Sequence, residues 1–116
     1  MIMCLDKLSL RSNKIDNSMM KRMKMKFLQG AAIRSIDLSD NPIGDKGSKY
    51  VKEYFAENWF IEELILSQVG LTDQGIIKII DIFSTSPNMK VLDISNNEKM
   101  QKIVQIAEKR TRILGQ

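Results

Sequence analysis

The chain repeats one spacing of apolar residues, and its clearest copy is Ile33-Arg34-Ser35-Ile36-Asp37-Leu38-Ser39-Asp40-Asn41-Pro42-Ile43. Counted along this copy, apolar side chains stand first, fourth, sixth and eleventh, and an asparagine stands ninth. One step of 28 residues back, the same slots hold Leu5, Leu8, Leu10, Asn13 and Ile15. One step forward, they hold Ile61, Leu64, Leu66, Val69 and Leu71. A second step forward, they hold Met89, Leu92, Ile94 and Asn97. Self-similarity at a period in the twenties indicates a solenoid of stacked units.

The second half of each unit carries residues spaced four apart, as on one face of a helix. These residues are Met19, Met23 and Phe27, then Gly47, Val51 and Phe55, then Gly75, Ile79 and Phe83, then Ile103, Ala107 and Thr111. We expect this face to pack against the core and the intervening cations to be solvated. Asn17, Asp45 and Asp73 share one column, and we predict that they accept hydrogen bonds from the free amides at the starts of the helices.

A strand pattern L-x-x-L-x-L-x-x-N and a helix within 28 residues resemble the leucine-rich repeat family, in its ribonuclease-inhibitor-like class. The resemblance implies an α/β solenoid of about four strand-helix units, with parallel strands on the concave face and helices on the convex face. It covers the chain as a single domain, 1–116, with units at residues 1–32, 33–60, 61–88 and 89–116. It also implies that Asn13, Asn41 and Asn97 are structural, their amides satisfying backbone groups of adjacent turns. Val69 departs from this asparagine column.

The composition leaves little for catalysis or metal binding. The 116 residues include no histidine and a single cysteine, Cys4, which excludes Cys/His zinc sites and Cys/His nucleophilic catalysis. Asp37 and Asp93 lie two units apart, about 10 Å across a parallel sheet, which is a spacing that suits paired carboxylates. An open sheet offers them no cleft, so two solvated aspartates are the favoured interpretation. We expect a protein that is not an enzyme and that needs no cofactor.

The outward-facing positions of the predicted strands are the best candidate site, because the fold leaves them free to vary. They hold cations near the N-terminal end, anions farther along, small hydroxyls and two apolar residues. The predicted partner-binding residues of the concave face are Lys7, Ser9, Arg11, Ser35, Asp37, Ser39, Glu63, Ile65, Ser67, Val91, Asp93 and Ser95. Separated charges of this kind orient a partner. The sequence therefore predicts a non-enzymatic protein-protein interaction module, although serines merely tolerated on an exposed strand are an equal interpretation.

Two alternatives use the same scaffold differently. One is a pathogen effector or a subunit of a larger assembly, which differs in setting and not in fold. The other is an RNA-associated protein that uses the basic clusters at residues 21–26 and 109–112. Net charge is +4, but the cations gather in the first and last units and the anions in the middle. Nucleic-acid binding usually needs one continuous basic stripe, so we expect nucleic acid to be an unlikely partner.

The ends of the chain carry little of the capping that a solenoid needs. Only residues 1–4 precede the first repeat pattern, and the chain stops where a fifth unit would begin. An uncovered parallel edge invites pairing, so we expect self-association through terminal repeats, or membership of a longer protein or assembly. No apolar run approaches the length of a membrane span, and the start resembles no secretory signal. We therefore expect no membrane association and a cytoplasmic location, or the host cytosol for a secreted effector.

Overall fold

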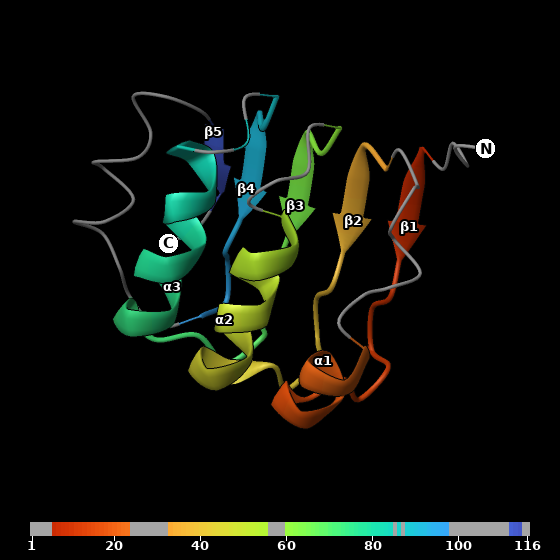
Figure 1. Ribbon diagram of the computed structural model, residues 1–116, viewed down its shortest axis with the longest axis vertical. Helices are drawn as coiled ribbons and strands as arrows, with labels where there is room; N and C mark the ends of the chain where they lie inside the picture. Colours follow the sequence, from red (N-terminus) through yellow and green to blue (C-terminus); the bar gives the residue numbers. More distant parts are fainter. Residues whose placement is uncertain are drawn as a thin grey trace.

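The computed structural model describes residues 6–23, 33–55, 60–84, 86, 88–97 and 112–114. Its sheet is parallel, with the strands side by side in chain order (Figure 1). The strands are β1 (Lys7–Ser9), β2 (Ser35–Asp37), β3 (Glu63–Ile65), β4 (Val91–Asp93) and β5 (Arg112–Leu114). Each strand is three residues long, and an apolar residue follows β1, β2, β3 and β4 directly.

The register of the sheet follows the sequence repeat. Leu8 is opposite Ile36, Ile36 is opposite Leu64, and Leu64 is opposite Leu92. We call residues at the same position of successive units a row. The next partner of Leu92 is Ile113, only 21 residues later, so the last step is shorter than the others. The chain thus adds a fifth strand, where the sequence pattern predicted only terminal apolar cover.

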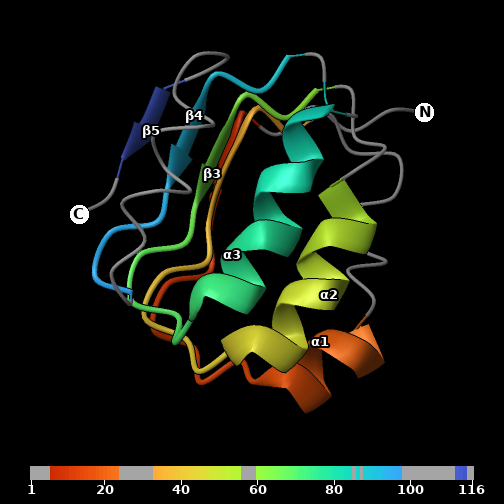
Figure 2. The same ribbon diagram turned by 90° about the vertical axis from the view of Figure 1, so that its left-hand side faces the viewer.

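The helices lie together on one face of the sheet (Figure 2). They are α1 (Asn17–Met23), α2 (Gly44–Phe55) and α3 (Asp73–Ile80), the last continued by the 3₁₀ turn η2 (Asp81–Ser84). Strand and helix alternate in each described unit, which confirms the predicted α/β repeat solenoid. The helix predicted for the fourth unit falls in residues 98–111, outside the described residues. Within the described part of the chain, no helix has both the length and the apolar character to span a membrane.

The core lies between the sheet and the helices. The inward rows of units two to four are almost fully buried. Exposure is at most 1% in the row of Ile36, Leu64 and Leu92 and in the row two residues later, which holds Leu38, Leu66 and Ile94. The predicted helical face of α2 is confirmed at Val51 and Phe55. On α1 the predicted Met19 packs against the core but is only partly buried, and its neighbour Met20, which the pattern did not include, is fully buried.

The buried residue of α1 has counterparts at the same position of α2 and α3. Met20, Ser48 and Ile76 form the most buried helical row, each with 0% exposure. The row before it holds glycine in units two and three, where the helices come close. A Cβ on Gly47 would stand 2.5 Å from Ile43 and 3.4 Å from the backbone of Asn17 on the previous helix. Met19, in the same row of the first unit, is partly buried and packs against the core.

The predicted helix caps also need correction. At α1 the acceptor is Asp16, whose Oδ1 receives the amide of Met19 at 2.8 Å, and not Asn17. Asp45 does not cap its own helix. Its carboxylate instead accepts the amide of Thr72 at 2.8 Å, and the Thr72 hydroxyl as well, at the start of α3 in the next unit. Asp45 thus joins the second unit to the third at the start of α3.

The asparagine ladder is present as expected. Asn41 Oδ1 accepts the amides of Asn13 and Ile15 from the first unit, and its amide group donates to three carbonyls of both turns. Asn97 repeats the arrangement one unit from the other end, accepting the amides of Val69 and Leu71. Val69, which stands in the asparagine column, is buried in the core. Its carbonyl accepts the amide of Gly44 at 2.8 Å, so a backbone contact replaces the missing side-chain rung.

Candidate protein-interaction surface

The face of the sheet opposite the helices, which we call the strand face, holds the predicted partner-binding residues. The structure divides them into three groups by exposure. Lys7, Ser9 and Arg11 of the first unit are exposed. The partly exposed group consists of Asp37, Glu63, Ile65, Val91, Asp93 and Ser95. The buried group consists of Ser35, Ser39 and Ser67.

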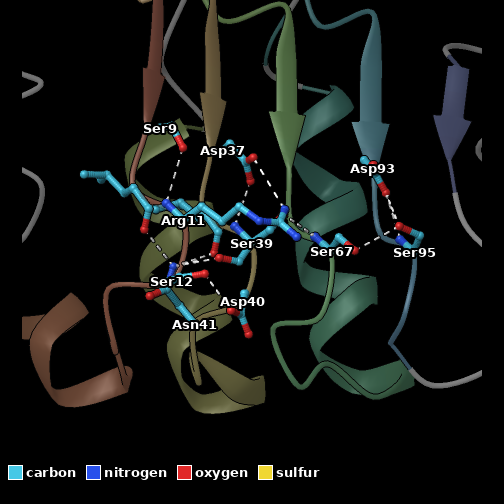
Figure 3. A network of polar contacts seen from close by, with 12 residues as sticks. Ser9, Arg11, Ser12, Asp37, Ser39, Asp40, Asn41, Ser67, Asp93 and Ser95 are labelled. Atoms are coloured by element: carbon cyan, nitrogen blue, oxygen red, sulfur yellow. Dashed lines mark hydrogen bonds and ion pairs between the residues drawn. The ribbon is translucent and has the colours of Figure 1, made fainter.

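The buried serines contradict the prediction that their side chains are free for a partner. Each strand ends after three residues, so Ser39 and Ser67 belong to the turn and no longer alternate outward. Ser39 Oγ accepts the amide of Ser67 at 3.0 Å, and the Ser95 hydroxyl lies 3.1 Å from that of Ser67 (Figure 3). Ser35 is shielded as a short side chain between the longer Lys7 and Glu63 in its row. These three serines are structural.

The aspartates of the strand face are held by the turns that follow them. Asp37 Oδ1 accepts the amide of Ser39 at 2.9 Å, and Asp93 Oδ1 accepts the amide of Ser95 at the same distance. Ser95 also donates its hydroxyl to Asp93 at 2.7 Å. Each carboxylate is therefore fixed in orientation while part of it faces solvent (Figure 3). A fixed charge loses little side-chain entropy when a partner binds.

Arg11 is the most prominent cation of this surface. Its side chain reaches across from the first unit toward Asp37, with 3.8 Å between Arg11 Nη1 and Asp37 Oδ2 (Figure 3). The two side chains are 54% and 24% exposed, so this ion pair contributes little to stability. The guanidinium keeps donors available for a second acceptor. The sequence-predicted residues Arg11 and Asp37 are thus brought together by stacking of units.

The turns after the strands add a polar rim that sequence reasoning missed. Ser12, Asp40, Gln68 and Asn96 form one exposed row with backbone φ angles of 55° to 60°. This is the left-handed region, which residues other than glycine occupy with some strain. Ser12 donates its hydroxyl to Asp40 at 2.6 Å. The sequence signal that could have identified this row is a polar residue that recurs every 28 positions, directly before each position of the asparagine column.

A second missed row lies at the other end of the strands. Asp6, Arg34, Glu62 and Lys90 alternate in sign along the solenoid. Arg34 forms a bidentate pair with Asp6 at 2.6 and 2.8 Å, and Lys90 pairs with Glu62 at 2.9 Å. The hydrogen bonds from Arg34 lower the pKa of the Asp6 carboxyl, and those to Asp6 raise the pKa of Arg34. We call these four residues the alternating row.

The chemistry of the strand face is that of charged, hydroxyl and apolar side chains. Nowhere in the described ranges do three or more Asp, Glu, Cys or His side chains gather as a metal site would require. Asp37 and Asp93, considered above as paired carboxylates, are separated by the whole of β3 and each is committed to its own turn. The surface offers fixed charges, hydroxyls and exposed apolar area from Ile65 and Val91.

Comparison with known proteins agrees with the observed repeat. A family model described as Leucine Rich repeat matches residues 33–50. Among solved structures, a chain titled Leiomodin-1 Actin-Binding Site 2 superposes with a TM-score of 0.77, covering 95% of this chain and 69% of that one. The chain has the fold of a leucine-rich repeat protein. Sequence identity to the leiomodin structure is 14%, so that likeness concerns the fold alone.

Curated relatives of this chain are much longer than it is. The chain is 32% identical over 74 residues to the Protein Cep78 homolog of Drosophila melanogaster, which covers 63% of this chain. It is 34% identical over 68 residues to the Centrosomal protein of 78 kDa of Mus musculus, which covers 58% of it. The matched region spans 9% of the length of each of these relatives.

Proposed function

We propose that this chain is a non-enzymatic protein-interaction module that binds a protein partner through its strand face. The observation that carries the proposal is the state of the side chains there. Asp37 and Asp93 are oriented by hydrogen bonds to their own turns while remaining partly exposed, and Arg11 is exposed beside Asp37. Ile65, between the two aspartates, adds accessible apolar area. An apolar centre among fixed charges is an arrangement that favours protein recognition.

The comparisons support a protein partner in this proposal. The relative from Mus musculus is named a centrosomal protein, which fits a role in a protein assembly. We propose a cytoplasmic setting for this chain, in an assembly in which a repeat module supplies contacts. The partner's surface should carry a carboxylate to meet Arg11, a cation to meet Asp37 or Asp93, and an apolar residue over Ile65.

Affinity capture with the purified chain, read by mass spectrometry, identifies the partner, and variants then locate its site. Ile65→Asp and Arg11→Glu should each weaken binding at least tenfold, because one places a charge in the apolar centre and the other reverses the main cation. Asp37→Asn together with Asp93→Asn removes two charges while keeping an oxygen that accepts the turn amides. Circular dichroism confirms that each variant remains folded.

Lys78→Glu on the exposed side of α3 is the matched control for the charge changes, since it alters net charge equally on the helix side. We expect it to leave affinity within about twofold. If Lys78→Glu abolishes capture while Ile65→Asp and Arg11→Glu do not, the strand face is not the binding surface.

A further inference from the structure

Among the described residues, those of the first unit beside β1 are less covered than their counterparts in the interior units. In the described sheet β1 is the terminal strand and pairs with β2 alone (Figure 1). Leu8 and Leu10 are partly exposed, whereas residues of the same two rows in units two to four are at most 1% exposed. An edge strand and an apolar end are thus presented together.

Asn13 is an unfilled position of the asparagine ladder at this same end. In units two and four, Oδ1 of Asn41 and of Asn97 accepts two backbone amides from the preceding unit. Asn13 donates its amide to Arg11 at 3.1 Å, but its exposed Oδ1 accepts no hydrogen bond from the described residues. Its oxygen therefore stands ready for the amides of a turn stacked on β1. Because these amides come from a turn, a strand followed by a tight turn fits this end better than a fully extended peptide does.

The charges at this end specify the incoming strand further. In the alternating row Arg34 is flanked by Asp6 and Glu62, whereas Asp6 meets a cation on one side only and is 66% exposed. Lys7 follows it and is exposed at the edge. A strand added at β1 in register would be stabilised by a cation beside Asp6 and, one residue later, an anion beside Lys7.

We propose that this end binds, by strand addition, the strand-turn segment of a leucine-rich repeat in a partner protein that carries a cation-anion pair at these two positions. The proposal concerns a surface separate from the strand face. A second copy of this chain is a poor occupant, because none of its own units supplies that pair. The corresponding dipeptides are Asp6-Lys7, Arg34-Ser35, Glu62-Glu63, Lys90-Val91 and Thr111-Arg112.

The interior of the protein shows how such a segment would be held. The third unit lies on the fourth through the amides of Leu66 and Gln68, which donate to the carbonyls of Asp93 and Ser95 at 2.7 and 3.1 Å. The amides of Val69 and Leu71 reach Asn97 Oδ1 at 3.1 and 3.0 Å. In the first unit the equivalent acceptors are the carbonyls of Ser9 and Arg11 and the Asn13 side chain. A segment with the backbone of residues 61–72 therefore matches this end.

The test uses two synthetic peptides of residues 61–72, labelled with a fluorophore and identical in composition. The first carries Glu62→Lys and so presents Lys-Glu; the second carries Glu63→Lys and presents Glu-Lys. Binding to the 116-residue chain is followed by fluorescence anisotropy. We expect the Lys-Glu peptide to bind about tenfold more tightly, because both cross-strand pairs change from repulsive to attractive.

Variants of the chain assign the contact. Lys7→Glu should remove the preference between the peptides, whereas Lys46→Glu, an equal charge change on α2, should keep it. Asn13→Ala should weaken both peptides about tenfold through loss of two hydrogen bonds, and Gln68→Ala, an exposed amide control, should not. Lys7 forms no ion pair with the described residues and lies at the surface, so this variant stays informative even if Asn13→Ala unfolds.

Three outcomes would overturn the proposal. The first is no saturable binding of either peptide, and the second is equal binding of both by the unmodified chain. The third is a dimer in light scattering that excludes the peptides and is broken by Lys7→Glu, which would assign the end to a second copy.

Discussion

Single polar residues hold successive units together in this protein. Asn41 is 2% exposed and exchanges five hydrogen bonds with backbone groups of two units. Buried backbone groups that lose a partner cost about 1 to 3 kcal/mol each, more than the hydrogen bond itself contributes. The importance of the asparagine column therefore depends on whether a unit precedes the residue.

Asn41→Ala should destabilise the protein by about 3 kcal/mol or more, because it leaves amides and carbonyls of two turns without partners. Urea unfolding followed by circular dichroism measures the effect. Asn13→Ala is the matched control, since Asn13 is exposed and makes one backbone hydrogen bond. We expect it to cost less than about 1 kcal/mol; equal costs would contradict the ladder as a stabilising device.

Tyr54 links α2 to α1 by donating its hydroxyl to the carbonyl of Met20 at 3.0 Å. Burial raises the pKa of Tyr54, and the neighbouring Glu53 adds to the effect. A raised pKa in the folded state means that the stabilisation is fully present below the unfolded value of about 10 and is lost as pH rises through the folded value. Stability should therefore fall in the alkaline range and be level near neutrality.

Tyr54→Phe tests this by removing the titrating group and the donor together. At pH 7 it should cost about 1 kcal/mol, and it should flatten the alkaline loss of stability. Denaturant unfolding at several pH values measures both effects, and absorbance at alkaline pH should lose its late-titrating tyrosine. Tyr50→Phe controls for the other tyrosine. An unchanged alkaline profile in Tyr54→Phe would show that Tyr54 is not the linked group.

At the scale of elements, the helices are spaced by small residues and by contacts that cross units. Gly75 lies on α3 where it passes closest to α2, and a Cβ there would collide with Asp45 Oδ1 and stand 2.8 Å from Leu71. The same carboxylate receives the amide and hydroxyl of Thr72. Packing of α2 on α3 and the start of α3 therefore depend on one glycine.

Gly75→Ala should destabilise the protein by about 1 to 3 kcal/mol, even though alanine is the better helix former by about 1 kcal/mol. The reason is overpacking against Asp45 and Leu71, and thermal unfolding measures it. Gln74→Ala, a change at the neighbouring exposed position of α3, is the control and should be close to neutral. Stabilisation by Gly75→Ala would show that the helices have room to separate.

At the scale of the whole molecule, burial is uneven along the solenoid. Leu64 in the third unit is 0% exposed, with a strand on each side, whereas its counterpart Leu8 is partly exposed at the end. Each unit of a repeat protein is stabilised by its neighbours, so an end unit has less to lose than an interior one. Stability should therefore rise from the first unit toward the third.

Leu64→Ala should cost about 2 to 5 kcal/mol, because it opens a cavity against both neighbouring units. Leu8→Ala should cost clearly less, since part of its side chain is already in water. Unfolding in urea compares the two, and amide hydrogen exchange should show earlier opening at β1 than at β3. An unchanged midpoint for Leu64→Ala would contradict the register of the repeat.

Self-association through the terminal repeats stays a prediction, and the charges of the rows predict how it depends on salt. The row that begins with Lys7 ends at Arg112, so stacking β5 of one copy on β1 of another brings two cations into one row. We expect such stacking to be weak at low salt and to strengthen as salt screens the repulsion. Light scattering over a range of protein and salt concentrations measures it, and a mass that falls with added salt would contradict this mode of contact.

The repeat architecture was predictable from the sequence alone. A 28-residue step places Leu8, Ile36, Leu64 and Leu92 in one row before any propensity is consulted, and stacked units must bury such a row. The asparagine column was predictable for the same reason. Lys7, Asp37, Ile65 and Asp93 are at least partly exposed, as alternation along a short strand predicts, whereas the exposure of Arg11 in the turn after β1 does not follow from alternation.

Only the tertiary structure decided which polar groups are free and which are used between units. Ser39 and Asp45 look like surface residues in the sequence, yet each accepts a backbone amide of the following unit. The shortened last step that forms β5 and the open oxygen of Asn13 are likewise visible only when units are stacked. The physical reason is that a periodic sequence specifies what each unit contains, whereas hydrogen bonds between units depend on where each strand ends and how closely the next one lies.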